Sequence, residues 1–239
     1  MKYVLIFCIF LFSFNIFGQG SVTDIDGNTY KTVKIGEQEW MAENLKTTHY
    51  HDGHPILTWK DSLQWVQFAS VQAAYCWYKN DSITYKPKYG ALYNYHAAQD
   101  NRICPIGWRV PSQQDFYQLI LFLDPHANTV MYAITETAGK LLKEEGHNNW
   151  PIYENVVGSN TTGFSAIGAG CRGYMGWYNS APYFGYYWGT DGWTIAMRYA
   201  TDRIFMRNGI GQEVAVSVRC VKGYNLPFYG QLFNNNLTK

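Results

Sequence analysis

One stretch of twenty residues, CPIGWRVPSQQDFYQLILFL at 104–123, limits the possible folds of this chain more than any other. Pro105 and Gly107 predict a turn directly after the cysteine. Trp108 and Val110 then alternate with a polar residue, as in a short, half-buried extended segment. The first part of the stretch therefore predicts a strand that a cysteine can anchor.

The second part predicts the main helix of the domain, at about 112–123. Ser112 follows a proline and is a favourable N-cap, and Asp115 lies three residues later, where its carboxylate can bond back to the cap. The apolar residues that follow recur at helical spacing, at Phe116, Leu119, Ile120 and Leu123.

The rest of the chain predicts short antiparallel strands joined by irregular loops. Asp26-Gly27-Asn28 predicts a hairpin between strands at 22–25 and 29–35. Helices are expected at 63–70 and at 131–145, and a loop at 86–88. Further strands are expected at 39–41, 74–78, 186–190, 193–199, 204–206 and 214–221. These elements indicate a single compact α+β domain at 20–223 with twisted strands and long Gly- and aromatic-rich loops, followed by a frayed tail at 224–239.

Residues 1–19 have the pattern of a secretory signal peptide. Lys2 supplies the positive charge, residues 3–17 are almost wholly apolar, and small residues follow at 18–20. A retained N-terminal anchor is the alternative. We expect an exported protein, secreted or at the cell surface, without a membrane span after signal cleavage.

Charge and composition bear on the choice of partner. The formal net charge is only +1 and 15% of residues are charged, which argues against nucleic acid as a partner. The chain holds 20 Tyr and 9 Trp, residue types that are used at recognition surfaces as well as in cores.

Four cysteines follow the predicted signal peptide, and an even number in an exported protein indicates disulfides. We favour a Cys104–Cys220 bridge and place a Cys76–Cys171 bridge second. The alternative for the second pair is two free, buried thiols.

Glycine and asparagine surround many aromatic residues between 158 and 193, which favours a rigid but adaptable recognition surface. A sugar ring could stack on Trp177 or Tyr183 while Asn179 or Asp191 binds its hydroxyl groups. The expected ligand-binding residues are Trp177, Tyr178, Asn179, Tyr183 and Asp191. The alternative is that these aromatic side chains only build the domain.

Other kinds of site have weaker support. His49, His51 and His54 in the HYHDGH loop are the one candidate metal set, but a structural site would usually need a fourth ligand, so a solvated loop is favoured. No G-x-S-x-G motif is present, and carboxylates such as Glu144 and Asp202 form no recognisable catalytic pair. We expect no catalytic residue and no cofactor.

Seven ordered motifs resemble those of the Fibrobacter succinogenes major paralogous domain family. They are YKTVKIGEQEWMAENLKT (30–47), AYCWYKND (74–81), YGALYNYHA (89–97), CPIGWRVPS (104–112), TGFSAIGAGCRG (162–173), YYWGTD (186–191) and SVRCVKG (217–223). The resemblance covers roughly residues 22–223. Where the family usually has Gly-Gly-Tyr-Arg, this chain has Ala169-Gly170-Cys171-Arg172, which weakens the case for a Cys76–Cys171 bridge.

The resemblance implies a fold similar to C-type lectins and formylglycine-generating enzymes, in which the terminal strands pair and a cysteine near the first helix can bridge to the last strand. This supports Cys104–Cys220. The family brings no established activity, and the calcium-dependent sugar motifs of C-type lectins are missing from this sequence. The function we expect is a non-enzymatic recognition module that binds a glycan or a surface protein. The alternatives are a structural component of a cell-surface assembly and an enzyme of the formylglycine-generating or hydrolytic type.

Overall fold

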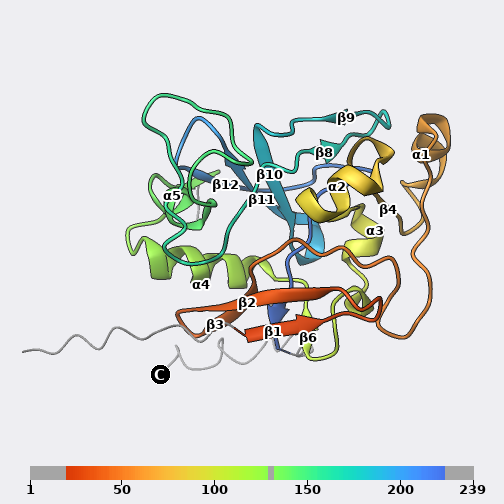
Figure 1. The fold of residues 1–239 in the computed structure, drawn as a ribbon, viewed down its shortest axis with the longest axis horizontal. Helices are drawn as coiled ribbons and strands as arrows, with labels where there is room; N and C mark the ends of the chain where they lie inside the picture. The colour runs from red at the N-terminus through yellow and green to blue at the C-terminus, as the bar shows by residue number, and fades with distance from the viewer. Residues whose placement is uncertain (1–19, 129–131, 224–239) are drawn as a thin grey trace, which may run out of the picture.

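A computed structural model describes residues 20–128 and 132–223, and within them a mixed α and β fold confirms the predicted mixture of helices and antiparallel strands (Figure 1). The predicted signal peptide, the C-terminal tail and the start of the predicted 131–145 helix lie outside the described residues. No helix in the described ranges is long and apolar enough to cross a membrane.

A five-stranded antiparallel sheet lies along one side of the molecule and brings together both ends of the described chain (Figure 1). Its first two strands form the hairpin predicted around Gly27, where Asp24 Oδ1 accepts a hydrogen bond from the backbone of Asn28 at 2.9 Å. In spatial order the strands are β1 (Gly20–Thr23), β2 (Thr29–Ile35), β3 (Gln38–Met41), β13 (Val221–Lys222) and β6 (Trp108–Arg109). The last strand of the chain is therefore held between two early ones.

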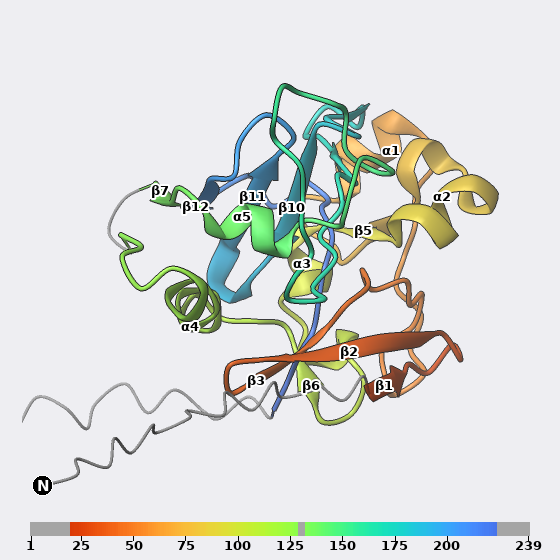
Figure 2. The ribbon, with the colours of Figure 1, turned by 60° about the vertical axis from the view of Figure 1, so that its left-hand side comes forward.

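A second antiparallel sheet has four strands and packs its inner face on the main core. In order they are β10 (Phe184–Trp188), β11 (Trp193–Arg198), β12 (Ile204–Asn208) and β7 (Ala133–Thr135). Between this sheet, the five-stranded sheet and the main helix lies an aromatic core, in which Trp40 stacks on Phe116 at 5.7 Å and meets the edge of Phe164 at 5.8 Å. Figure 2 shows the two sheets with the helix beside them.

The main helix, α4 (Gln113–Leu123), forms as predicted. Ser112 and Asp115 make a reciprocal capping box, and Phe116, Leu119 and Ile120 are buried. The Arg109 guanidinium also binds the Asp115 carboxylate with two hydrogen bonds, at 2.5 and 2.8 Å. Burial would raise the pKa of Asp115, but the bonds from Arg109 and Ser112 outweigh it and lower the pKa.

The remaining elements of the described chain are short. They are α1 (Ser62–Phe68), β4 (Tyr75–Cys76), α2 (Ser82–Tyr89), β5 (Leu92–Tyr93), α3 (Tyr95–Ala98), β8 (Cys171–Arg172), β9 (Tyr178–Asn179) and three 3-10 turns at Tyr78–Asn80, Asn101–Ile103 and Thr190–Gly192. Helix α2 replaces the loop predicted at 86–88. Asp81 caps it, and Pro87 near its end leaves the earlier hydrogen bonds intact.

The prediction of a helix at 131–145 is wrong for most of these residues. Strand β7 occupies its first part, and only α5 (Ala138–Leu142) is helical. The Thr135 hydroxyl donates to Asp124 at 2.5 Å, which fixes the extended segment after α4. Gly139 lies so close to the carbonyl of Asp202 that an added Cβ would sit 2.5 Å from its oxygen, so tertiary packing decides the conformation here.

The strand predicted at 214–221 is also not a regular strand. Its residues from 215 to 221 are all buried, and they pair in turn with separate parts of the chain. Ala215 bridges Arg172, Val216 bridges Tyr93, and only Val221 joins a sheet. This segment is the spine of the domain, and it passes from the four-stranded to the five-stranded sheet (Figure 2). Both faces of this segment are covered.

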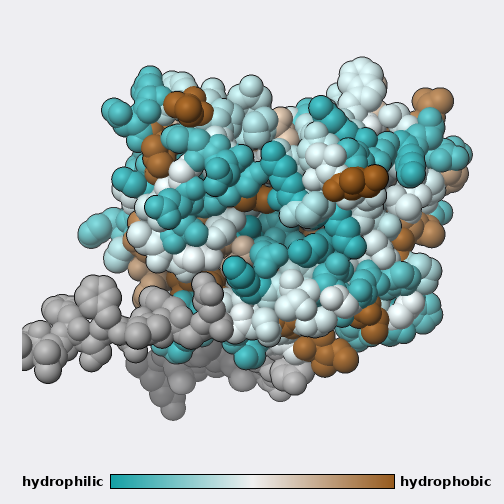
Figure 3. Space-filling view, in the orientation of Figure 1, coloured by the Kyte–Doolittle hydropathy of each residue, from teal (hydrophilic) through white to brown (hydrophobic). Residues whose placement is uncertain are grey.

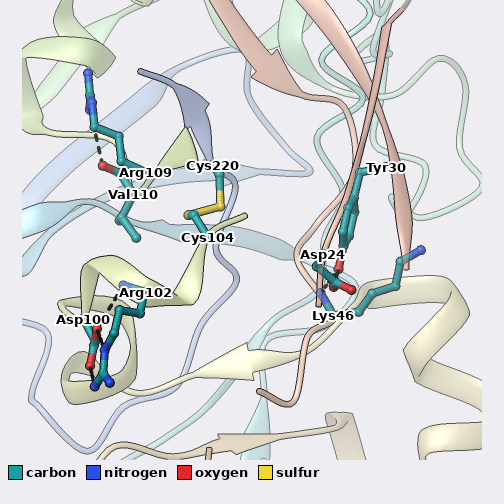
Figure 4. Close-up of a disulfide and its surroundings, with 9 residues drawn as sticks. All are labelled: Asp24, Tyr30, Lys46, Asp100, Arg102, Cys104, Arg109, Val110 and Cys220. Carbon is teal, nitrogen blue, oxygen red and sulfur yellow. Dashed lines mark hydrogen bonds and ion pairs between the residues drawn. A yellow bond between two sulfur atoms is a disulfide. The ribbon is translucent and has the colours of Figure 1, made fainter. Parts of the chain in front are cut away.

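The Cys104–Cys220 disulfide forms as predicted and joins the segment before β6 to the end of the spine (Figure 4). The second predicted bridge is absent, because Cys76 and Cys171 are both free and buried. The Cys171 thiol instead donates to Asn179 Oδ1 at 3.0 Å, and Cys76 lies in a separate hydrophobic cluster.

We expect the double variant Cys104→Ser/Cys220→Ser to lose about 2–5 kcal/mol of unfolding free energy, because the bridge closes a loop between residues 116 positions apart. Urea denaturation measures this loss. Cys76→Ser is the control for a buried cysteine outside the bridge.

Alkylation in denaturant followed by peptide mass spectrometry should label Cys76 and Cys171 before reduction, and Cys104 and Cys220 only after it. A mixed pattern would contradict the pairing.

Candidate binding pocket

The β8–β9 hairpin presents the most exposed aromatic loop that the structure describes. Its turn carries three large exposed side chains, Tyr174 at 63%, Met175 at 48% and Trp177 at 67% of full exposure. On the face drawn in Figure 3, apolar residues form small separate patches within a mainly hydrophilic surface. A local aromatic loop is therefore a better candidate for recognition than a broad apolar face.

Arg172 holds this loop in place, although its own side chain is fully buried. Its Nε donates to the carbonyl of Gly176 in the turn at 3.0 Å, and Nη1 donates to the carbonyl of Trp59 at 2.6 Å. Nη2 reaches two more carbonyls, those of Lys60 and Asp61, at 3.2 and 3.3 Å. One guanidinium thus ties the turn to the segment that leads into α1.

Aromatic rings and a glycine complete this anchor. The guanidinium carbon lies 4.2 Å from the ring centre of Trp65 and 5.0 Å from that of Tyr178, distances typical of cation–π contacts. Gly176 has a φ of +75°, and a Cβ there would lie 2.8 Å from the carbonyl oxygen of Ser62. The turn is consequently fixed against the start of α1, and its exposed rings lose little conformational entropy when a ligand binds.

A pocket of about 340 Å³ opens between the hairpin, the outer face of the four-stranded sheet and the start of the spine. Tyr174 and Tyr186 contribute aromatic walls, and the apolar lining comes from Ile210, Val214 and Val216. Apolar walls with a few polar groups are typical of pockets for small ligands or sugar units.

Three polar side chains complete the lining, from Asn179, Cys171 and Arg207. Asn179 Oδ1 accepts from the Cys171 thiol at 3.0 Å and from the Ser180 hydroxyl at 2.6 Å. Neither the Asn179 side-chain NH2 nor the Arg207 guanidinium donates a hydrogen bond to any described residue. Both donors are thus available to a ligand.

Cys171 is a poor nucleophile in this setting. Burial raises the pKa of its thiol to about 11, against the opposing influence of the nearby positive charge of Arg207. At neutral pH the side chain is therefore a neutral donor to Asn179, and it fixes the orientation of that amide.

The structure separates the residues that the sequence predicted as one ligand-binding set. Trp177 and Asn179 belong to the hairpin, whereas Tyr178 is structural, since its hydroxyl donates to Asn80 at 2.7 Å and its ring covers Arg172. Tyr183 packs edge-on against Tyr199 at 5.2 Å. Asp191 lies beyond the far end of β10 from Tyr183, so it cannot share one sugar-sized site with Trp177 and Tyr183.

Sequence reasoning missed Arg172 and Arg207 as parts of this region and gave Tyr186 no separate role. The alternation Tyr186-Tyr187-Trp188 was a usable signal, because Tyr187 is 1% exposed in the core while its neighbour Tyr186 faces the pocket.

The histidine loop is held by carboxylates and gathers no metal ligands. His49 Nδ1 lies 2.6 Å from Asp26, and His54 Nδ1 lies 3.1 Å from Asp52, which also pairs with Arg102 at 2.7 Å. Within the described ranges no three His, Cys, Asp or Glu side chains come close enough to hold a metal ion. The set of His49, His51 and His54 therefore does not form a site here.

Arg172→Lys should destabilise the protein by about 2–4 kcal/mol, because one ammonium group cannot replace a guanidinium that reaches four carbonyls. Chemical denaturation measures the change. Arg203→Lys is the matched control, since Arg203 is half-exposed and pairs only with the exposed Glu136, so it should change stability by less than about 0.5 kcal/mol. Equal effects of the two variants would contradict the anchoring role.

Alkylation of Cys171 by iodoacetamide should accelerate about tenfold per pH unit between pH 8 and 10, since a thiol with a pKa of about 11 is ionised in only about one molecule per thousand at pH 8. Mass spectrometry of the modified peptide follows the rate. A rate that levels off near pH 8.5, as for an ordinary thiol, would show that burial does not control this group.

Comparison with known proteins identifies a matching family but no individual protein that matches this chain. Residues 33–222 match the Fibrobacter succinogenes major domain, a span that includes the disulfide, the four-stranded sheet and the pocket. No curated protein matches the chain significantly, and no solved structure does so either. Because the match covers most of its length, the chain belongs to the Fibrobacter succinogenes major domain family.

Proposed function

We propose that this protein is an exported, non-enzymatic recognition module that binds a glycan or a surface protein through the β8–β9 pocket. The observation that carries the proposal is the pocket itself, in which two tyrosine rings lie beside the unpaired donors of Asn179 and Arg207. Export rests on the signal-like pattern of residues 1–19.

A C-type-lectin-like architecture is part of this proposal. Two features support it: β13 pairs with the early strand β3, and a cysteine just before β6 and α4 bridges to the end of the spine. Both are arrangements expected of such a scaffold, which keeps the chain ends together and leaves long loops for display.

The chemistry of the cysteines gives less support to an enzyme of the formylglycine-generating type. Such an enzyme would need reactive thiols close together. Here Cys104 and Cys220 form a buried disulfide, and burial raises the pKa of both Cys76 and Cys171 to about 11. A recognition role does not require any of these cysteines to ionise.

Binding of the purified protein to a panel of soluble glycans and insoluble polysaccharides tests the proposal. Tyr174→Ala and Tyr186→Ala should each weaken saturable binding about tenfold or more, equal to about 1.4 kcal/mol, because each removes a ring that lines the pocket.

Phe122→Ala is the matched control, since Phe122 is 58% exposed on α4, away from the pocket. It should leave binding unchanged. If no glycan binds, the glycan form of the proposal fails. A defined oligomer or protein partner that is insensitive to the pocket variants would instead favour a structural component of a surface assembly.

A further inference from the structure

The outer face of the four-stranded sheet continues the pocket and differs in character from its inner face. Side chains alternate along each strand, so Tyr187, Ile195 and Met197 point into the core. Phe184 and Tyr186 on β10 lie on the opposite side, as do Arg198 on β11 and Arg207 on β12, an arrangement set by the antiparallel register.

Two rings on this face stack on each other and form an aromatic platform. Phe184 and Tyr186 are two residues apart on β10, and their rings are nearly parallel, at 2°, with centres 5.5 Å apart. Both side chains are half-buried, so each ring is held from one side while part of its surface is open. Parallel, partly open rings suit the stacking of a flat apolar face such as that of a sugar ring.

Two arginines flank the platform. The Arg198 guanidinium lies 5.3 Å from the ring centre of Phe184 and 4.4 Å from that of Phe205, which fixes its plane. Arg207 lies on the next strand but one from Tyr186 and lines the same pocket as that ring.

Neither arginine has its charge neutralised within the part of the chain that the structure describes. No ion pair and no side-chain hydrogen bond joins Arg198 or Arg207 to a described residue, whereas nearby Arg203 is paired with Glu136 and Lys143 with Asp202. The lining of the adjoining pocket includes Arg207 and no carboxylate.

We propose that this face and the adjoining pocket bind a glycan that carries carboxylate groups, such as a uronic-acid polymer; this inference rests on the proposed recognition function. The planar fork of an arginine matches a carboxylate through two parallel N–H···O bonds. The ring platform takes the sugar ring, and Arg207 and Arg198 take its carboxylates. Asn179 supplies a neutral donor for a hydroxyl group.

The test compares polygalacturonate with the same polymer after methyl esterification, because the two differ in charge and share the sugar backbone. The protein should bind polygalacturonate at least tenfold more tightly than its methyl ester. Arg207→Gln and Arg198→Gln should each remove most of this preference while binding to the ester changes little.

Arg203→Gln is the matched control, because it removes the same charge from the same region at a residue that is already paired. It should keep the preference for the acid. Melting temperatures of all variants should match the wild type, so that lost binding reflects the removed guanidinium.

Each of the following outcomes would overturn the inference. Equal binding of the acid and the ester would leave glycan recognition standing but reject carboxylate selection. An equal loss in Arg203→Gln, or equally tight binding of dextran sulfate, would show that bulk charge is responsible. Tighter binding of single-stranded oligothymidylate than of polygalacturonate would assign the ring and arginine face to nucleic acid. Failure to bind any neutral or acidic glycan would reject the proposed function as well.

Discussion

Buried cations that donate to backbone carbonyls are the interaction on which this fold depends. Much of the chain is irregular, and a buried carbonyl without a donor costs free energy. Arg172 and Arg219 are 0% and 2% exposed, and together they donate to the carbonyls of six loop residues. The Lys143 ammonium binds the carbonyl of Thr201 at 2.9 Å. Burying a charge costs several kcal/mol, which charge-assisted bonds and aromatic contacts offset.

Arg219 shows how this interaction organises the centre of the molecule. It lies on the spine beside Cys220, and its Nε donates to Asn44 Oδ1 at 2.8 Å. Nη1 and Nη2 donate to the carbonyls of Phe164 and Ser165, and the rings of Phe164 and Tyr187 lie 4.4 and 5.2 Å from the guanidinium. The spine therefore connects the first sheet, the disulfide and the aromatic core. Because Val214 and Val216, just upstream, line the pocket, the candidate site is built directly on the most constrained segment of the chain.

Local signals predicted the parts of the fold whose causes are local. The Asp26-Gly27-Asn28 turn and the Ser112 and Asp115 capping box form as expected. The Cys104–Cys220 bridge also forms, but it joins residues 116 positions apart, and its prediction had support from the family resemblance. The helix prediction for 131–145 failed because the bond of Thr135 to Asp124 and the pairing of β7 with β12 hold the first part of this segment extended. Arg172 and Arg219 could not be placed either, since no sequence pattern separates a buried arginine from a solvated one. The Arg207 and Tyr186 pair depends on strand register, which only the folded sheet defines.

Strand β10 packs on the core with one face and contributes to the proposed binding surface with the other. On β10, Tyr187 fills the core and its hydroxyl accepts from the backbone of Ile167, while Phe184 and Tyr186 turn their rings outward. A change to an outward ring leaves the core contacts of Tyr187 in place, because adjacent residues of a strand point to opposite faces. The β8–β9 hairpin also separates structural from exposed side chains. Arg172 is buried and holds the loop in place, whereas Trp177 is exposed and does not hold it. In this arrangement the exposed residues of the proposed binding surface can vary at little cost to folding, while the buried cations cannot. This is the physical condition for one scaffold to carry different surfaces.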